Sequence, residues 1–213
     1  MTIRVMVIDD QAMIRGALAG LLDLETDIEV VAQAANGVEA LDELARLSGE
    51  ETDPRTRPPV DVAIVDVEMP RMDGITATEA IRTRFPSVRV LVVTTFGRPG
   101  YLQRALAAGA SGFMVKDAPV EDLVDGVRTV AAGGRTIDQS LAIDALSAGA
   151  SPLTARETDV LREVEGGGTI ADIAHALTLS QGTVRNHVSS AMLKMDARTR
   201  AEAASLARAA GWL

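Results

Sequence analysis

The first 132 residues alternate short apolar runs with amphipathic stretches, and no other feature of the sequence restricts the fold as strongly. Runs rich in Val and Ile predict buried strands, and the stretches between them have the apolar spacing of helices. This alternation predicts a parallel sheet covered by helices on both faces. The expected strands are Ile3–Ile8, Ile28–Ala34, Val60–Val67, Val88–Thr94 and Phe113–Val115. The expected helices are Ala12–Leu22, Val38–Leu47, Ile75–Phe85, Leu102–Ala108 and Val120–Ala131.

The strand pattern stops before the last 60 residues or so, where only helical patterns remain. We therefore expect an α/β domain at residues 1–132, a linker at 133–151 with room for a short helix, and an all-α domain at 152–213. The polar segment Ser48–Pro59 predicts a long surface loop. The expected helices of the second domain are Ala155–Glu165, Ile170–Leu177, Gln181–Met195 and Arg198–Ala210.

Composition excludes several classes of protein. Cysteine is absent, so disulfides and thiolate metal sites are excluded. No early apolar run follows a basic stretch, and no segment is long and apolar enough to span a bilayer. We therefore expect a soluble, cytoplasmic protein.

The charge is distributed unevenly along the chain. The formal net charge of −9 argues against nucleic-acid binding by the chain as a whole. The acidic excess lies in residues 1–150, whereas residues 151–213 contain 7 basic and 7 acidic side chains. Positive charge is concentrated between residues 180 and 200, where a DNA-reading helix would need it. The basic side chains there are Arg185, Lys194, Arg198 and Arg200.

Carboxylates and a lysine follow the expected strands. Asp9 and Asp10 follow the first, Asp66 the third and Lys116 the fifth, and Thr94 ends the fourth. The carboxyl ends of parallel strands share one edge of the sheet, so these residues should converge. Clustered carboxylates raise each other's pKa unless a cation neutralises them, and Mg²⁺ suits such oxygen ligands. Asp66 could then attack a phosphoryl group whose oxygens Lys116 and the Thr94 hydroxyl would contact.

Simpler interpretations exist for each residue alone. Asp10 could cap the helix that begins near Ala12, and Lys116 could be a solvated surface charge. The functional interpretation rests on the whole set, which has suitable residue types at four strand ends. A Mg²⁺-dependent phosphatase or phosphotransferase with Glu68 as general acid is an alternative. However, the chain offers no substrate-binding insertion, and the second domain would remain unexplained.

The segments IDD, VDVEMPRMDG, VVTTF and GFMVKD together resemble the receiver domain of two-component response regulators, over residues 3–132. The resemblance implies a flavodoxin-like fold whose five-stranded parallel sheet has the order 2-1-3-4-5. It implies that a sensor histidine kinase phosphorylates Asp66, which accepts the group without enzymatic turnover. Mg²⁺ would be held by Asp10, Asp66 and the backbone carbonyl of Glu68, with Asp9 acting through water.

The same resemblance assigns a switch. Thr94 matches the switch hydroxyl, Phe113 the switch aromatic residue and Lys116 the phosphate-contacting lysine, although Phe113 could also simply fill the core. Phosphate would draw Thr94 inward and free space for Phe113, which shifts the population toward a homodimer. Either the surface around the fourth helix and fifth strand or the face of the first and fifth helices would form the dimer.

The second domain has the pattern of a helix-turn-helix. Thr154 and Glu157 fit a capping box, three glycines at 166–168 end the first helix, and Ser180 is a candidate N-cap. A short helix, a tight turn and a helix with polar and basic early residues suit major-groove recognition. A helical bundle that binds protein or only dimerises is the alternative.

Candidate DNA contacts follow from side-chain chemistry. Arg185 can bond guanine and Asn186 adenine, whereas hydroxyls and basic groups suit phosphates. Val184 either packs inward or touches a thymine methyl group. His187 is expected to pack or contact the DNA backbone rather than bind metal. The candidate DNA-binding residues are Thr183, Val184, Arg185, Asn186, Ser189, Lys194 and Arg200.

The segments LTARETDVL and DIAHALTLSQGTVRNHVSSAMLKM resemble the LuxR-type helix-turn-helix over residues 153–213. This implies recognition of double-stranded promoter DNA by the helix starting near Gln181, and domain pairing through the helix at 198–210. Both halves together resemble the NarL/FixJ class, and EMPRMDG and SQGTVRNHVS look most like its DesR branch. That branch implies a DesK-like kinase and control of membrane-lipid genes. The alternative within this class is a constitutive DNA binder or dimeric scaffold.

Overall fold

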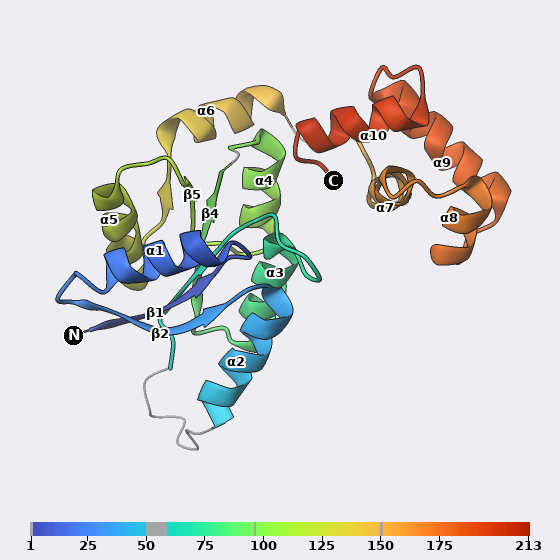
Figure 1. Cartoon of the computed structure of the whole chain (residues 1–213). Helices are drawn as coiled ribbons and strands as arrows, with labels where there is room; N and C mark the ends of the chain where they lie inside the picture. The colour runs from blue at the N-terminus through green and yellow to red at the C-terminus, as the bar shows by residue number, and fades with distance from the viewer. Residues whose placement is uncertain (1, 50–58, 96, 150) are drawn as a thin grey trace. The chain divides into compact units, whose positions relative to one another are not determined.

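A parallel sheet with the strand order β2-β1-β3-β4-β5-β6 forms the first half of the chain (Figure 1). The structure is a computed structural model that describes residues 2–49, 59–95, 97–149 and 151–213. All strand pairs are parallel, as the alternation of strands and helices predicts. The strands are β1 (Ile3–Ile8), β2 (Ile28–Ala34), β3 (Val62–Val65), β4 (Arg89–Thr94), β5 (Gly112–Val115) and β6 (Thr136–Ile137).

Helices cover both faces of the sheet. Alternate residues of each strand point to opposite faces, so Val5 and Val7 of β1 pack with Leu22 and with the buried side of α5, and Met6 and Ile8 point to the other face. Figure 1 shows α1 and α5 on one face and α2, α3 and α4 on the other. The helices are α1 (Ala12–Leu22), α2 (Gly37–Gly49), α3 (Gly74–Arg84), α4 (Pro99–Ala107) and α5 (Val120–Ala131).

The sheet has six strands, so the prediction of five was one short. The additional strand β6 has two residues and lies in the segment predicted to be linker. It pairs with β5, where Gly112 lies opposite Thr136 and Phe113 opposite Ile137. A Cβ atom on Gly112 would lie 2.7 Å from the Cγ2 atom of Thr136, so the glycine makes room for the strand. Two residues are too few to produce a periodic signal in the sequence.

The helix α6 (Gln139–Ala148) fills the place of the short helix expected in the linker. The chain forms two compact units, one of Met1–Gly97 and Leu102–Ile143, the other of Arg98–Tyr101 and Asp144–Leu213. Most of the predicted surface loop, at residues 50–58, lies outside the described residues, and Ser48 belongs to α2.

The second unit contains four helices after α6, as predicted. They are α7 (Ala155–Glu165), α8 (Ile170–Ala176), α9 (Gln181–Lys194) and α10 (Arg200–Ala209). The capping box at Thr154 and Glu157 and the cap by Ser180, which accepts from the Thr183 N–H, are both confirmed. These helices pack around a small core of Val, Leu, Ile and Ala side chains, which buries the apolar face of each helix.

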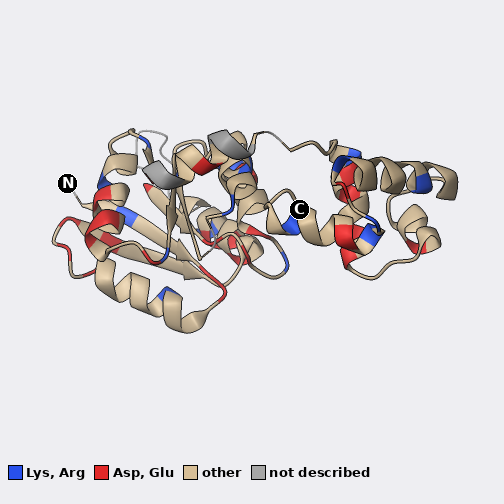
Figure 2. Cartoon of the chain, turned by 90° about the horizontal axis from the view of Figure 1, so that it is seen from above, with Lys and Arg blue, Asp and Glu red and all other residues tan. Residues whose placement is uncertain are grey.

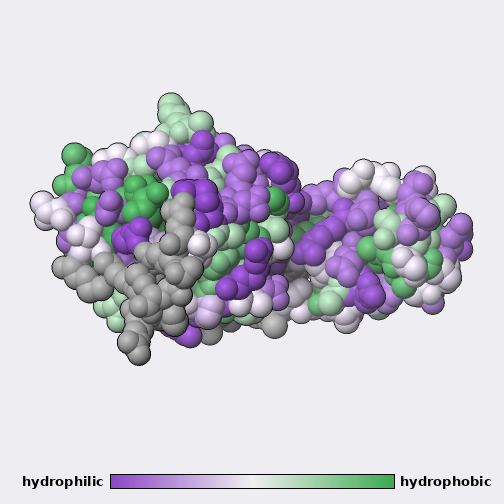
Figure 3. Space-filling model, turned by 90° about the horizontal axis from the view of Figure 1, so that it is seen from below, coloured by the Kyte–Doolittle hydropathy of each residue, from purple (hydrophilic) through white to green (hydrophobic). Residues whose placement is uncertain are grey.

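The described residues include no helix with the length and hydropathy of a bilayer span. On the face drawn in Figure 3, hydrophobic side chains appear in separate areas between hydrophilic ones.

Candidate functional site

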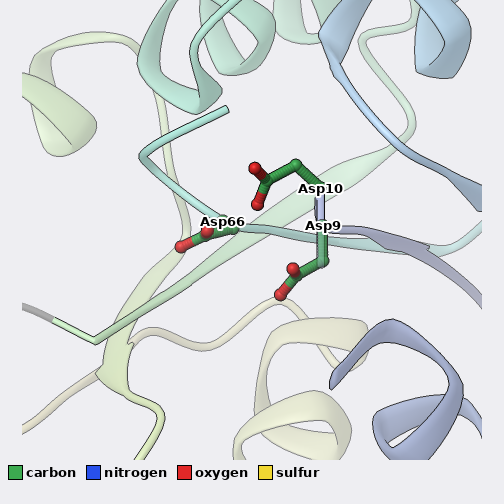
Figure 4. A group of neighbouring side chains, drawn as sticks. All are labelled: Asp9, Asp10 and Asp66. Carbon is green, nitrogen blue, oxygen red and sulfur yellow. The ribbon is translucent and has the colours of Figure 1, made fainter. Parts of the chain in front are cut away.

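Four strand ends meet at one edge of the sheet, as predicted. Asp9 and Asp10 directly follow β1 and Asp66 follows β3, while Thr94 ends β4 and Lys116 follows β5. Each of the three acids offers a carboxylate oxygen, and these oxygens lie within 4.8 Å of one another (Figure 4). Residues far apart in the sequence therefore form one acidic pocket.

The pocket is buried and short of positive charge. The Lys116 Nζ atom lies 2.7 Å from Asp9 Oδ2 and 3.1 Å from Asp66 Oδ2, and all three side chains are at most 8% exposed. Burial raises the pKa of Asp66 to about 6, since the attraction of Lys116 only partly offsets it and Asp9 adds repulsion. Among the described residues, one lysine forms ion pairs with two of the three carboxylates, so the pocket retains negative charge that a cation could balance.

The donor set of the pocket fits a hard divalent cation such as Mg²⁺. Only oxygen ligands are clustered, and Asp10 is exposed, so a bound ion could keep several waters. The alternative that Asp10 is the N-cap of α1 is wrong, because the N-cap residue is Gln11, whose own side chain makes no capping hydrogen bond. The Gln11 N–H donates to Asp9 Oδ1 over 2.9 Å, and Asp10 belongs to the cluster of carboxylates. Glu68 lies in the loop after β3, and its role as a backbone ligand stays a prediction.

Two residues that the sequence reasoning missed hold the loop after Asp66 in place. The Asp73 Oδ1 atom accepts hydrogen bonds from the N–H groups of Ile75 and Thr76, both over 2.9 Å, and so caps α3. A Cβ atom on Gly74 would lie 1.8 Å from the carbonyl oxygen of Asp66, so no other residue fits there without a backbone shift. An Asp-Gly pair before a helical pattern is a helix-start signal that could have identified both.

The two predicted switch residues are completely buried. Thr94 lies opposite Val115 on β5, and Phe113 lies between Val92 of β4 and Ile137 of β6. Burial suits both core filling and a switch for Phe113, so its switch role stays a prediction.

The second unit has the geometry of a helix-turn-helix. The helices α8 and α9 are joined by a short turn in which Thr178 adopts the left-handed conformation with φ of 55°. Early in α9, Arg185, Asn186 and Ser189 are all exposed, so their polar groups are available to a ligand. Acidic and basic side chains are interspersed in this unit (Figure 2).

Two of the candidate DNA contacts lie in unexpected surroundings. Val184 is 0% exposed in the core of the unit, which supports inward packing and offers no surface to a thymine methyl group. The Lys194 Nζ atom lies 2.6 Å from Oε2 of the buried Glu157. Thr183 is partly exposed at the start of α9, and Arg200 is partly exposed as the first residue of α10.

Comparison with protein families matches both units. The family described as "Response regulator receiver domain" matches residues 5–128, which is more than half of the chain. The family described as "Bacterial regulatory proteins, luxR family" matches residues 151–207. The chain belongs to the response regulators with a LuxR-type DNA-binding domain.

Relatives resemble this response regulator over its whole length. The transcriptional regulatory protein YvfU of Bacillus subtilis is 41% identical over 211 residues, which are 99% of this chain and 100% of that protein. The transcriptional regulatory protein DesR of the same organism is 38% identical, over 99% of this chain and 98% of that protein. The chain is therefore a transcriptional regulator of a two-component system and not a metabolic enzyme, which sets aside the phosphatase alternative.

Solved structures share the fold of the response regulator. The response regulator ChrA of a heme-sensing two-component system is 31% identical, with a TM-score of 0.55 over 100% of this chain and 99% of that chain. A structure of two RcsB dimers bound to two parallel DNAs matches with a TM-score of 0.64 at 23% identity, over 98% and 99% of the two chains. At that identity the RcsB match shows the fold alone.

Proposed function

We propose that the regulator accepts a phosphoryl group on Asp66 from a cognate sensor histidine kinase, and that phosphorylation promotes homodimerisation and binding to promoter DNA in the cytoplasm. The observation that carries this proposal is the buried Asp66 carboxylate within a cluster of three acids and one lysine. Burying charged groups in this way lowers the stability of the fold. Buried acids with a shifted pKa are therefore concentrated at functional sites, where the charge is used.

The residues of the pocket have distinct roles in the transfer. One Asp66 oxygen forms a bond to phosphorus as the phosphorus–nitrogen bond to the kinase histidine breaks, and that histidine keeps the electron pair. The other side of the carboxylate stays oriented, because Asp66 Oδ1 accepts from the Val67 N–H over 2.8 Å. Lys116 offsets charge on the transferred oxygens.

Asp10, Asp66 and the backbone carbonyl of Glu68 would hold Mg²⁺, with Asp9 acting through water. When bound, the ion neutralises the carboxylates and polarises the phosphoryl oxygens. The exposed side of the cluster at Asp10 is where the ion can keep its waters.

The phosphoryl group then biases the buried switch residues. Its oxygens accept a hydrogen bond from the Thr94 hydroxyl, and Phe113 turns into the space that Thr94 leaves. Because Phe113 is packed between strands β4 and β6, its movement changes the surface near this edge of the sheet. A homodimer forms on the surface that the phosphorylated state favours.

In the DNA-bound state, α9 lies in the major groove. Arg185 and Asn186 bond to base edges, whereas Thr183, Ser189 and Arg200 contact phosphates. The exposure of Arg185, Asn186 and Ser189 on α9 supports this arrangement.

Incubation with acetyl phosphate and Mg²⁺, followed by a phosphate-affinity gel, tests the acceptor. We expect the wild type and the Asp117→Asn control, an exposed acid beside Lys116, to shift on the gel. Asp66→Asn should not shift, and chelation of Mg²⁺ should abolish the wild-type shift. A shifted Asp66→Asn band would reject the assignment.

DNA selection with the phosphorylated protein tests the output. It should yield one site with two half-sites, whose spacing gives the dimer geometry. Affinity for that site should rise on phosphorylation in the wild type and stay low in Asp66→Asn. Equal affinity with and without phosphodonor would favour the constitutive DNA binder. Control of membrane-lipid genes and a DesK-like kinase stay predictions, which the selected sequence can test against candidate promoters.

A further inference from the structure

Glu157 is a buried acid that the proposed function does not use. The residue is 3% exposed at the start of α7, and among the described residues it is the only buried acid outside the Asp9–Asp66 pocket. Acidic side chains are rarely buried completely unless they are paired. Its partners therefore indicate what the burial achieves.

Both carboxylate oxygens of Glu157 are fully engaged. Oε2 accepts from the Thr154 N–H over 2.7 Å and from Lys194 Nζ over 2.6 Å, and Oε1 accepts from Ser190 Oγ over 2.6 Å. Burial alone raises the pKa of Glu157, but the hydrogen bonds from Lys194, Ser190 and Thr154 outweigh it and lower the pKa to about 2. The side chain is thus ionised at neutral pH and connects the start of α7 to α9.

The two α9 partners of Glu157 lie on a different side of the helix from Arg185, the basic residue proposed to bond to base edges. Ser190 and Lys194 are four residues apart and share one stripe, as do the exposed Arg185 and Ser189. At about 100° per residue, Lys194 is rotated about 140° around the helix axis from Ser189. The stripe that holds Glu157 is therefore separate from the stripe of Arg185 and Ser189. Thr183 and Asn186 lie within about 40° of Ser190 around the helix axis, so the contact with Glu157 adjoins the side proposed to face DNA.

We propose that Glu157 is a positioning residue for the DNA-reading helix α9, and that Lys194 is its counterion and not a phosphate contact. This inference rests on the proposed function of α9. If Lys194 turned to a phosphate, Glu157 would remain a buried charge with no counterion. The interaction with Glu157 fixes the rotation of α9 and so determines which side chains reach the bases.

The salt dependence of DNA binding separates a counterion from a phosphate contact. Each phosphate neutralised by a protein cation contributes about 0.9 to the slope of log affinity against log salt concentration. The probe is a duplex carrying the selected site, compared with a shuffled duplex of the same length. The full-length protein is phosphorylated with acetyl phosphate and Mg²⁺ in every arm.

The variants remove the charges singly and together. In Glu157→Gln/Lys194→Met the pair is neutral, so no buried charge is left alone and the domain can fold. We expect this double variant to keep the wild-type slope, whereas the matched control Arg200→Gln, which removes a proposed phosphate contact, loses about 0.9 of it. Lys194→Met alone should lower the preference for the selected duplex by about tenfold or more, and Lys194→Arg should restore it.

Each failure has a separate meaning. A slope reduced by about 0.9 in the double variant, relative to wild type, would make Lys194 a phosphate contact and overturn the inference. An unchanged preference in Lys194→Met would show that the pair does not position α9. An unchanged preference in Arg185→Gln together with an unchanged slope in Arg200→Gln would instead reject the proposed DNA contacts themselves.

Discussion

The two units of the regulator each bury carboxylates beside a lysine, with opposite results. In the α/β unit, burial raises the pKa of Asp66 to about 6, because the attraction of Lys116 only partly offsets the cost of burial and Asp9 adds repulsion. In the helical unit, hydrogen bonds from Lys194 and Ser190 outweigh burial and lower the pKa of Glu157 to about 2. The first cluster has too few donors, and the second satisfies both oxygens of its single carboxylate.

The difference distinguishes a reactive site from a structural one. A carboxylate with unbalanced charge retains affinity for a cation and for an electrophile, at a cost to stability. A carboxylate with every oxygen satisfied stabilises the fold and has nothing left to offer a ligand. The following four measurements test this contrast.

Loss of Lys194, the lysine that pairs with Glu157, should have the largest effect on stability. Lys194→Met leaves Glu157 buried without a counterion, and we expect the free energy of unfolding of the helical unit to fall by about 2–3 kcal/mol. The expected loss is smaller than for a fully buried ion pair because the Lys194 side chain is 32% exposed. Urea unfolding followed by the fluorescence of Trp212, the single tryptophan, reports on this unit. A loss below about 0.5 kcal/mol would place the pair with ordinary surface ion pairs.

Acid should weaken the helical unit through the same carboxylate. The pKa of Glu157 is about 2 in the folded protein against an ordinary 4.5, so its contribution is complete above pH 4.5 and is lost as the pH falls toward 2. Between pH 6 and pH 3 this amounts to about 2 kcal/mol. The pH dependence of Trp212-detected unfolding should be that much shallower in Glu157→Gln. Identical profiles would show that the carboxylate is not stabilised by its partners.

In the pocket of Asp9, Asp10 and Asp66, removal of a charged side chain should raise the stability of the unit instead of lowering it. Asp66→Asn removes one buried negative charge, so we expect the α/β unit without Mg²⁺ to gain about 1 kcal/mol of stability. Amide hydrogen exchange of peptides from β1 and β3 measures this unit by itself. Mg²⁺ should slow exchange in the wild type more than in the variant. Destabilisation by Asp66→Asn would mean that the pocket is already balanced.

Substitution of Thr178, which belongs to neither group of buried acids, should have the smallest effect on stability and serves as a control for the pH dependence. Thr178 has a β-branched side chain at φ of 55°, a conformation that asparagine tolerates better. Thr178→Asn should raise the stability of the helical unit by about 0.5 kcal/mol without changing its pH dependence. Trp212-detected urea unfolding at pH 7 and pH 3 checks both statements.

The sequence predicted the acidic pocket of Asp9, Asp10 and Asp66 better than the contacts of Glu157 with Ser190 and Lys194, for a physical reason. Asp9, Asp66 and Lys116 each follow an apolar run, and parallel strands bring such positions to one edge whatever the loop lengths. The partner of Lys194 is Glu157, 37 positions earlier, and no local periodicity encodes that contact. Basic residues late in a helix were therefore interpreted as DNA contacts.

Helix positions were predicted within a few residues, and some, such as Ala12–Leu22 and Val120–Ala131, at both ends. The capping residues Thr154 and Ser180 carry local hydrogen-bonding information, so their helix starts were predictable. The strand β6 was missed because its pairing with β5 depends on space beside Gly112, which the sequence pattern does not reveal.

That pairing sets a rule for engineered fusions. A chimera that joins this α/β unit to a foreign output domain after residue 132 would delete Thr136 and Ile137 and leave the backbone groups of β5 beside Phe113 without their neighbour. A junction after Ile137 keeps the edge closed. The portable module therefore includes the sixth strand, several residues beyond α5.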